Sequence, residues 1–175
     1  MTLPDGTLHE IERQLLDELE SVDPAVSQAD SAGAWLALVE QSGDLVRVKP
    51  ADGEWSALDV LAHLTVVELT NALRYRAMLA EDGPTLSDFG VSTWSSVLKG
   101  TDIQPPALLG MFRALRYDNL AFWEHLDAAG RARLGIHPEY GPESIELRFK
   151  MLAGHARMHL AQGRRAVAAA RSRSA

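Results

Sequence analysis

The sequence contains no cysteine, and this absence removes several kinds of chemistry at once. Disulfide bonds, cysteine nucleophiles and zinc sites built from thiolates are all excluded. Any metal ion must therefore be held by histidine, by carboxylates and by water. The chain has six histidines and 24 acidic residues from which such a site could be assembled.

The sequence also lacks the long apolar runs and the basic charge that direct proteins to membranes or nucleic acids. No stretch approaches the roughly 18–20 apolar residues of a membrane-spanning helix, and residues 1–6 lack the basic and apolar regions of a signal peptide. The net charge of −7 disfavours broad binding to nucleic acid or anionic membranes. We therefore expect a cytoplasmic protein with neither kind of partner.

The first part of the sequence has helical periodicity. A capping box formed by Thr7 and Glu10 precedes apolar residues that recur at helical spacing over residues 8–22. Pro24 is expected to end or bend this helix. A second apolar segment covers residues 35–39, and the sequence leaves open whether the two segments form one interrupted helix or two.

The middle of the sequence predicts a long helix followed by a long connection. A second capping box, formed by Ser56 and Asp59, opens a helix that extends to about Leu79. Glycine, proline and serine make residues 81–104 irregular, with room for a short helix over residues 91–99. A connection of this length in a small domain usually serves a function or moves.

The last part of the sequence predicts two more helices. Two prolines at residues 105–106 suit a helix start, and an apolar stripe follows over residues 108–126. A loop rich in glycine and proline leads to a final helix over about residues 144–169. We find no strand-like alternation and no hairpin turn, so the prediction is an all-α, four-helix bundle that forms one domain over residues 1–175.

Two histidines in the last helix organise the functional interpretation. His155 and His159 are four residues apart, so their imidazoles project from one helix face on successive turns. A pair alone holds a metal poorly, and His63 on an apolar helix is the best candidate for a third ligand. Ala156 follows His155, which excludes the HExxH pattern in which a glutamate activates water for peptide hydrolysis.

The face that carries these histidines is unusually polar for a buried helix face. It consists of Arg148, Leu152, His155, His159, Gln162 and Ala166. Four polar groups facing a core require an ion, water or a ligand to satisfy them. Gly154, which costs roughly 1 kcal/mol relative to alanine within a helix, would let another backbone or a ligand approach closely.

Several polar residues keep two interpretations. Asp59 lies one turn before His63, where it could orient the imidazole or serve only in its capping box. Asn119 interrupts an apolar stripe, so it either lines a polar cavity or bonds a neighbouring helix. Arg148 could bind an anionic substrate group or pair with a carboxylate. His137 precedes a proline in the last loop and could lie near the site.

Three motifs together resemble the DinB/YfiT-like superfamily of metalloenzymes. Their order and spacing cover about residues 8–170. The motifs are Glu54-Trp55-Ser56 followed by Leu61-Ala62-His63-Leu64 and Glu68, then His137-Pro138-Glu139-Tyr140-Gly141, then Gly154-His155 followed by His159-Leu160 and Gln162.

The resemblance implies an up-down-down-up bundle with a long connection between its second and third helices. It implies a divalent metal ion held by His63, His155 and His159, for which zinc or nickel is the first choice and iron, manganese or cobalt are alternatives. Glu68 and Gln162 match motif positions beside the ion or in its pocket. Members of the superfamily often form dimers, so we expect a homodimer.

Three functional classes remain open from the sequence. The resemblance favours a transferase or isomerase that uses a low-molecular-weight thiol such as mycothiol or bacillithiol, whose thiolate would bind the ion. Hydrolysis by a metal-bound water is the second class. The third is a stress-response protein that binds a metal or ligand without turnover. A small-molecule substrate is expected in the first two.

Different features would distinguish these classes. A basic pocket would favour the thiol, and its candidate residues are Arg74, Arg113, Arg116 and Arg148. A general base near the ion would favour hydrolysis, with Glu68 the candidate. The absence of a cavity beside the ion would favour binding without catalysis. We take Glu68, Arg148 and Gln162 as the candidate catalytic residues.

Overall fold

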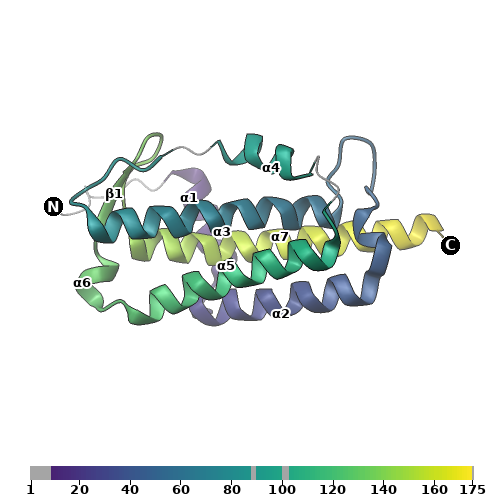
Figure 1. Cartoon of the computed structure of the whole chain (residues 1–175), viewed down its shortest axis with the longest axis horizontal. Helices are drawn as coiled ribbons and strands as arrows, with labels where there is room; N and C mark the ends of the chain where they lie inside the picture. Colours follow the sequence, from purple (N-terminus) through teal and green to yellow (C-terminus); the bar gives the residue numbers. More distant parts are fainter. Residues whose placement is uncertain (1–8, 88–89, 100–102, 175) are drawn as a thin grey trace.

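The computed structural model describes residues 9–87, 90–99 and 103–174 and shows a bundle of four long helices (Figure 1). The bundle helices are α2 (Pro24–Ser42), α3 (Ala57–Ala80), α5 (Pro105–His125) and α7 (Ile145–Ser174). The shorter elements are α1 (Glu10–Leu19), the 3₁₀ helix η1 (Gly43–Arg47), α4 (Val91–Lys99), α6 (Ala128–Arg131), β1 (Leu134–His137) and β2 (Gly141–Ser144). Helices α2 and α7 run in one direction and α3 and α5 in the other, which is the predicted up-down-down-up order (Figure 1).

Proline and a capping aspartate separate the first two helices. Helix α1 ends at Leu19, and Pro24 occupies the first turn of α2 instead of ending or bending the first helix. The Asp23 carboxylate accepts hydrogen bonds from the first backbone N–H groups of α2. The two apolar segments therefore belong to two helices. Thr7, half of the predicted N-terminal capping box, lies outside the described residues.

The capping box at the start of α3 is confirmed. The backbone N–H of Ser56 donates to the Asp59 carboxylate over 2.9 Å, and the backbone N–H of Asp59 donates to the Ser56 hydroxyl over 3.1 Å. These bonds satisfy backbone groups that the first turn of a helix leaves without partners. They also fix where α3 begins, and therefore where His63 lies along the bundle.

The prediction that the chain contains no strand or hairpin is wrong at one place. Strands β1 and β2 pair in antiparallel register from Leu134 opposite Ser144, and Gly141 takes a positive φ of 78° after the turn. The connection between α3 and α5 is hydrogen-bonded to β1, because the Leu86 N–H donates to the Ile136 carbonyl over 2.8 Å. Each strand has only four residues, which is too short for a visible alternating pattern.

The long connection between α3 and α5 contains the predicted short helix. Helix α4 spans Val91–Lys99 and packs against α3 along the outside of the bundle (Figure 1). The parallel direction of α3 and α5 requires the chain to return along the length of the bundle. The connection therefore covers one side of α3, where it can contribute residues to a site.

Two hydrophobic clusters fill the bundle on either side of a polar layer. They are built around Trp35, Leu61 and Phe112 and around Tyr75, Trp123 and Phe149. In the layer between them, an Nη2 nitrogen of Arg116 lies 2.7 Å from the Glu68 carboxylate. The Asn119 amide donates to the same carboxylate over 2.8 Å and to the Glu68 backbone carbonyl over 3.0 Å. Asn119 thus bonds a neighbouring helix, one of its two predicted roles.

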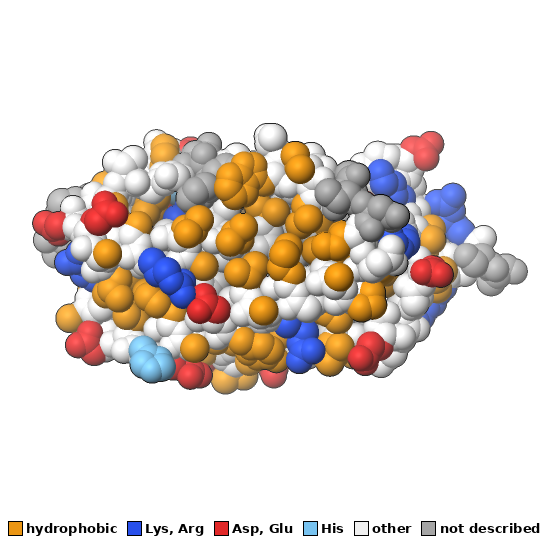
Figure 2. All heavy atoms as spheres, in the orientation of Figure 1, with side chains coloured by type: hydrophobic (Ala, Val, Ile, Leu, Met, Phe, Trp, Pro, Cys, Tyr) orange, Lys and Arg blue, Asp and Glu red, His pale blue; other side chains and the backbone are white. Residues whose placement is uncertain are grey.

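The outer face of α3, α4 and α5 carries exposed apolar side chains (Figure 2). The larger ones are Leu69, Leu73, Trp94, Val97, Met111 and Tyr117. Among the described residues, no helix is both long and apolar enough to cross a membrane. The homodimer expected from the sequence stays a prediction.

Helix α1 packs against α7 at Gly154, which explains this glycine in the middle of a helix. A Cβ atom added at Gly154 would lie 1.7 Å from the carbonyl oxygen of Leu15. The sequence-based expectation that another backbone approaches Gly154 is therefore confirmed. Only a glycine at this position allows α1 to lie so close to the helix that carries His155 and His159.

We predict that Gly154→Ala lowers the free energy of unfolding by about 1–3 kcal/mol, because the new methyl group pushes α1 away from α7. Gly110→Ala in α5 is the matched control, since a Cβ there meets nothing within 4 Å. That control should gain up to about 1 kcal/mol from higher helix propensity. Urea unfolding measures both variants, and an equal effect in the two would contradict the close approach of α1.

Candidate metal centre

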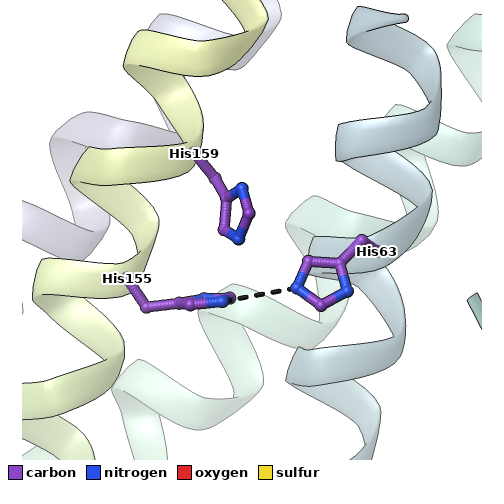
Figure 3. Close-up of side chains that lie close together, drawn as sticks. All are labelled: His63, His155 and His159. Carbon is purple, nitrogen blue, oxygen red and sulfur yellow. Dashed lines mark hydrogen bonds between the residues drawn. The ribbon is translucent and has the colours of Figure 1, made fainter. Parts of the chain in front are cut away.

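Three histidines from two bundle helices point toward one another in the space between α3 and α7 (Figure 3). His63 lies in the second turn of α3, and His155 and His159 lie on successive turns of α7. One ring nitrogen from each lies within 4.8 Å of the other two. Over the described ranges, no other set of three His, Asp or Glu side chains comes together in this way. The structure thus brings together the three residues that the sequence selected.

The spacing of these nitrogens fits one metal ion. Nε2 of His63 lies 3.3 Å from Nε2 of His155, and the three ring centroids are 4.3–5.2 Å apart. Two nitrogens bound to a tetrahedral ion at the usual length are about 3.4 Å apart. Three imidazoles without a carboxylate suit zinc, nickel or iron better than magnesium or calcium. The donor set is therefore complementary to a divalent transition metal.

A serine on α4 sets the tautomer of His63. The Ser95 hydroxyl donates to the Val91 carbonyl over 2.6 Å, so its oxygen accepts from Nδ1 of His63, 3.2 Å away. With the proton on Nδ1, Nε2 of His63 carries the lone pair that a metal requires. The connection between α3 and α5 therefore supplies part of the site.

Gln162 has the same effect on His159. Its amide oxygen lies 2.7 Å from Nδ1 of His159 and can only accept, so the proton stays on Nδ1 and Nε2 is available to an ion. Nδ1 of His155 is buried without a hydrogen-bond partner among the described residues. Two of the three rings thus have their orientation fixed by neighbours.

Ser95, and not Asp59, is the partner of His63. The Asp59 carboxylate is used by Ser56 in the capping box, which is the structural role that the sequence also allowed. No local signal identified Ser95, because it belongs to a serine-rich connection whose packing against α3 depends on the tertiary fold. Its position in the short predicted helix was the only indication available.

Burial favours the neutral form of the two imidazoles on α7. It lowers the pKa of His155 well below its ordinary value, and positive charge on His159 and His63 would act in the same direction. Burial also lowers the pKa of His159, although the hydrogen bond to Gln162 opposes this shift. Neutral rings at physiological pH are the form that binds metal.

A cavity of about 260 Å³ opens beside His63 and His155. Helices α1, α3 and α7 form its walls together with the turn between the strands. Its apolar lining includes Ile11, Val67 and Met151, and its polar lining includes Glu12, Arg74, His137, Tyr140 and Arg148. His137 thus borders the cavity although it does not belong to the histidine cluster.

Arg148 lines this cavity and is also paired with a carboxylate. Its Nε donates to buried Glu143 over 2.9 Å, and its Nη1 donates to Asn71 over 2.9 Å. Arg74 donates to the backbone carbonyl of Ser87 over 2.8 Å. Of the four arginines considered for a basic pocket, Arg74 and Arg148 border the cavity, whereas Arg116 is buried against Glu68.

Glu68 does not join the histidines. Both of its carboxylate oxygens are used in the polar layer, one by Arg116 and the other by Asn119. Its side chain is buried and is not part of the cluster of potential ligands. The structure therefore places Glu68 in the bundle core, whereas Gln162 lies directly behind a candidate ligand and Arg148 lines the cavity.

Known proteins resemble this chain in sequence and in fold. A protein of Geobacillus thermodenitrificans (strain NG80-2) that carries the name "Putative metal-dependent hydrolase" is 24% identical over 153 residues, which cover 79% of this chain and 85% of that protein. YfiT from Bacillus subtilis, described as a probable metal-dependent hydrolase with an unusual four-helix bundle topology, matches with a TM-score of 0.70 at 19% identity. The match covers 95% of this chain and 91% of YfiT.

The family assignment follows from the sequence model that matches this chain. The model of the DinB superfamily matches residues 27–162, a range that contains two of the four bundle helices complete, most of the other two and all three clustered histidines. The helix order expected from the resemblance is the one observed. The chain belongs to the DinB superfamily.

Proposed function

We propose that this chain is a divalent-metal-dependent enzyme that acts on a small molecule held in the cavity beside His63 and His155. The observation that carries the proposal is the convergence of three imidazoles, two of which, those of His63 and His155, line that cavity. A purely structural metal site would be closed by protein ligands, whereas three ligands beside a cavity leave room for a further molecule.

The neighbours of the histidines prepare them for an ion. Ser95 and Gln162 keep the protons on Nδ1 of His63 and His159, so both Nε2 atoms face the same point. When bound, a divalent ion supplies a Lewis acid that lowers the pKa of a coordinated thiol or water. The apolar part of the cavity wall excludes bulk water from the reactants.

We favour a thiol S-transferase among the possible reactions. The described residues place no carboxylate base within the histidine cluster, since Glu68 is engaged elsewhere. A thiol has an ordinary pKa of about 8.5, whereas that of water is 15.7, so a thiol needs a much smaller shift to ionise near neutral pH. The thiol would release its proton to solvent, its sulfur would bond an electrophilic carbon, and the leaving group would depart with the bonding electrons.

Metal-dependent hydrolysis is the second candidate. It is favoured by the names of the Geobacillus relative and of YfiT, both of which describe metal-dependent hydrolases. In this reaction a water molecule would occupy the place of the thiol. The same histidines and the same cavity would serve, so the two candidates differ in the nucleophile and not in the residues that hold the metal.

One comparison of reactions tests the proposal. We expect the zinc- or nickel-loaded protein to accelerate the reaction of a low-molecular-weight thiol, such as bacillithiol or mycothiol, with 1-chloro-2,4-dinitrobenzene. His155→Ala should abolish the acceleration, and His125→Ala, which changes an exposed histidine outside the cluster, should not. If the protein accelerates only the hydrolysis of a p-nitrophenyl ester, the S-transferase proposal is wrong and metal-dependent hydrolysis is the better assignment. Acceleration of neither reaction would contradict an enzymatic role on these reaction classes.

The residues behind the imidazoles should control metal affinity. We predict that Ser95→Ala and Gln162→Leu each weaken binding of zinc by about 10–100-fold, because His63 or His159 loses the acceptor that fixes its tautomer. Ser96→Ala, an exposed position on the same helix, is the matched control for Ser95 and should bind normally. Competition with a chromophoric chelator, using protein made without a histidine tag, measures the affinities. Unchanged affinity in both variants would contradict the assigned tautomers.

The lowered pKa values of His155 and His159 should make the stability of the metal-free protein depend on pH. The unfolded chain takes up these protons near pH 6.5, whereas the folded rings take them up only at lower pH. The stability that the two neutral rings contribute is therefore complete above about pH 6.5 and is lost as the pH falls toward their folded pKa values.

We predict that the free energy of unfolding of the metal-free protein falls more between about pH 7.5 and about pH 5.5 than that of a His155→Gln, His159→Gln variant. Glutamine keeps a polar side chain at each position but does not titrate. Urea unfolding in the presence of a chelator measures both proteins. Parallel pH profiles would show that the two rings are protonated in the folded state as easily as in the unfolded chain.

A further inference from the structure

A second, larger hollow borders the histidine cluster from another side. It has a volume of about 630 Å³ and lies between the turn that precedes α3 and the second half of α7. Its lining includes Glu54, Trp55, His159, Gln162 and Arg165, and it shares no lining residue with the cavity beside His63 and His155. We call this hollow the Trp55 groove.

The Trp55 groove reaches the candidate metal centre directly. His159 is a wall of the groove, and the Trp55 ring lies nearly parallel to it at an interplanar angle of 13° and a centroid distance of 6.4 Å. Trp55 also contacts His63, with centroids 5.4 Å apart. Gln162, whose amide oxygen holds His159, is part of the same wall. A molecule in the groove would therefore lie beside the ring of a candidate ligand.

The groove carries one positive and one negative side chain. Arg165 and Glu54 are both exposed, and within the described part of the chain neither side chain forms an ion pair or a hydrogen bond. The other arginines that border the site differ in this respect, since Arg148 is paired with Glu143 and Arg74 donates to the Ser87 carbonyl. The groove thus offers two unused charges of opposite sign next to an aromatic ring.

We propose that the Trp55 groove binds the second substrate, and that this substrate carries an amino-acid-type ammonium and carboxylate. The guanidinium of Arg165 suits the carboxylate in a bidentate contact, and the Glu54 carboxylate suits the ammonium. The Trp55 face suits an apolar or aromatic side chain between them. A ligand with only one charge would leave either Glu54 or Arg165 without an oppositely charged group to contact and would bind less well.

This assignment rests on the proposed function, because a transfer between two molecules needs two binding sites that meet at the reacting centre. Two hollows border the histidine cluster and could hold one molecule each. The cavity reaches the cluster at His63 and His155, and the Trp55 groove reaches it at His159. Binding in the groove itself requires no metal, so it can be measured separately from metal binding and from catalysis.

Three related probes test the assignment on the metal-free protein in the presence of a chelator. S-benzyl-L-cysteine carries both charges and an aromatic ring, its N-acetyl derivative carries only the carboxylate, and its methyl ester carries only the ammonium. We expect the first to bind at least about tenfold more tightly than either derivative. Tryptophan fluorescence measures binding, and Trp55→Phe should remove most of the signal while the buried Trp35 remains.

Charge variants assign the two ends of the probe. Arg165→Gln should weaken binding of S-benzyl-L-cysteine by about tenfold or more, a loss of about 1.4 kcal/mol. Glu54→Gln should remove the preference for S-benzyl-L-cysteine over its N-acetyl derivative. Arg164→Gln is the matched control, because Arg164 is the exposed neighbour of Arg165 but does not line the groove.

Equal affinities in Arg165→Gln and Arg164→Gln would overturn the assignment, as would equal binding of the three probes or no measurable binding of any. His155→Ala separates this result from the proposed function, because His155 does not line the groove. That variant should lose metal but keep probe binding. If the protein binds metal but none of the probes, the groove assignment is wrong and the proposed metal-dependent reaction is unaffected. If the protein binds the probes but no metal, the groove assignment holds and the proposed function is wrong.

Discussion

The structure depends on how the bundle accommodates a layer of polar side chains halfway along its length. Buried polar groups are costly unless each finds a partner. On the core side, Arg116 and Asn119 both bond the Glu68 carboxylate between two hydrophobic clusters. On the opposite side, His63 and His155 face a cavity, and Nδ1 of His155 has no partner among the described residues. The same layer is closed on one side and open to a ligand on the other.

This division explains the placement of the candidate site. The closed side holds α3 and α5 at a fixed distance, because Arg116 and Asn119 of α5 both bond Glu68 of α3. The open side can then present imidazoles from α3 and α7 at a constant spacing. The glycine at position 154 lets α1 cover the cavity, and α4 provides Ser95 behind His63. Elements outside the four-helix bundle thus complete a site that the bundle positions.

Much of the fold and the core of the site could be predicted from the sequence. The i, i+4 spacing of His155 and His159 places both rings on one face, and the capping box at Ser56 fixes the start of the helix that carries His63. The serine that orients His63 could not be predicted, because its contact depends on how the connection packs. The four-residue strands were too short to show a pattern. Glu68 matched a motif position, but its partners on α5 are 48 and 51 residues away and made it a core residue.

X-ray absorption spectroscopy of the zinc-loaded protein is the decisive experiment for the three-histidine site, because it reports the ligands of the ion itself. We expect three imidazole nitrogens and at least one ligand that does not come from the protein, and we expect the loss of one imidazole in His63→Ala. A shell with fewer than three imidazoles in the unmodified protein would contradict this site. A spectrum that does not change in His63→Ala would contradict it equally, since the ion would then be bound without α3.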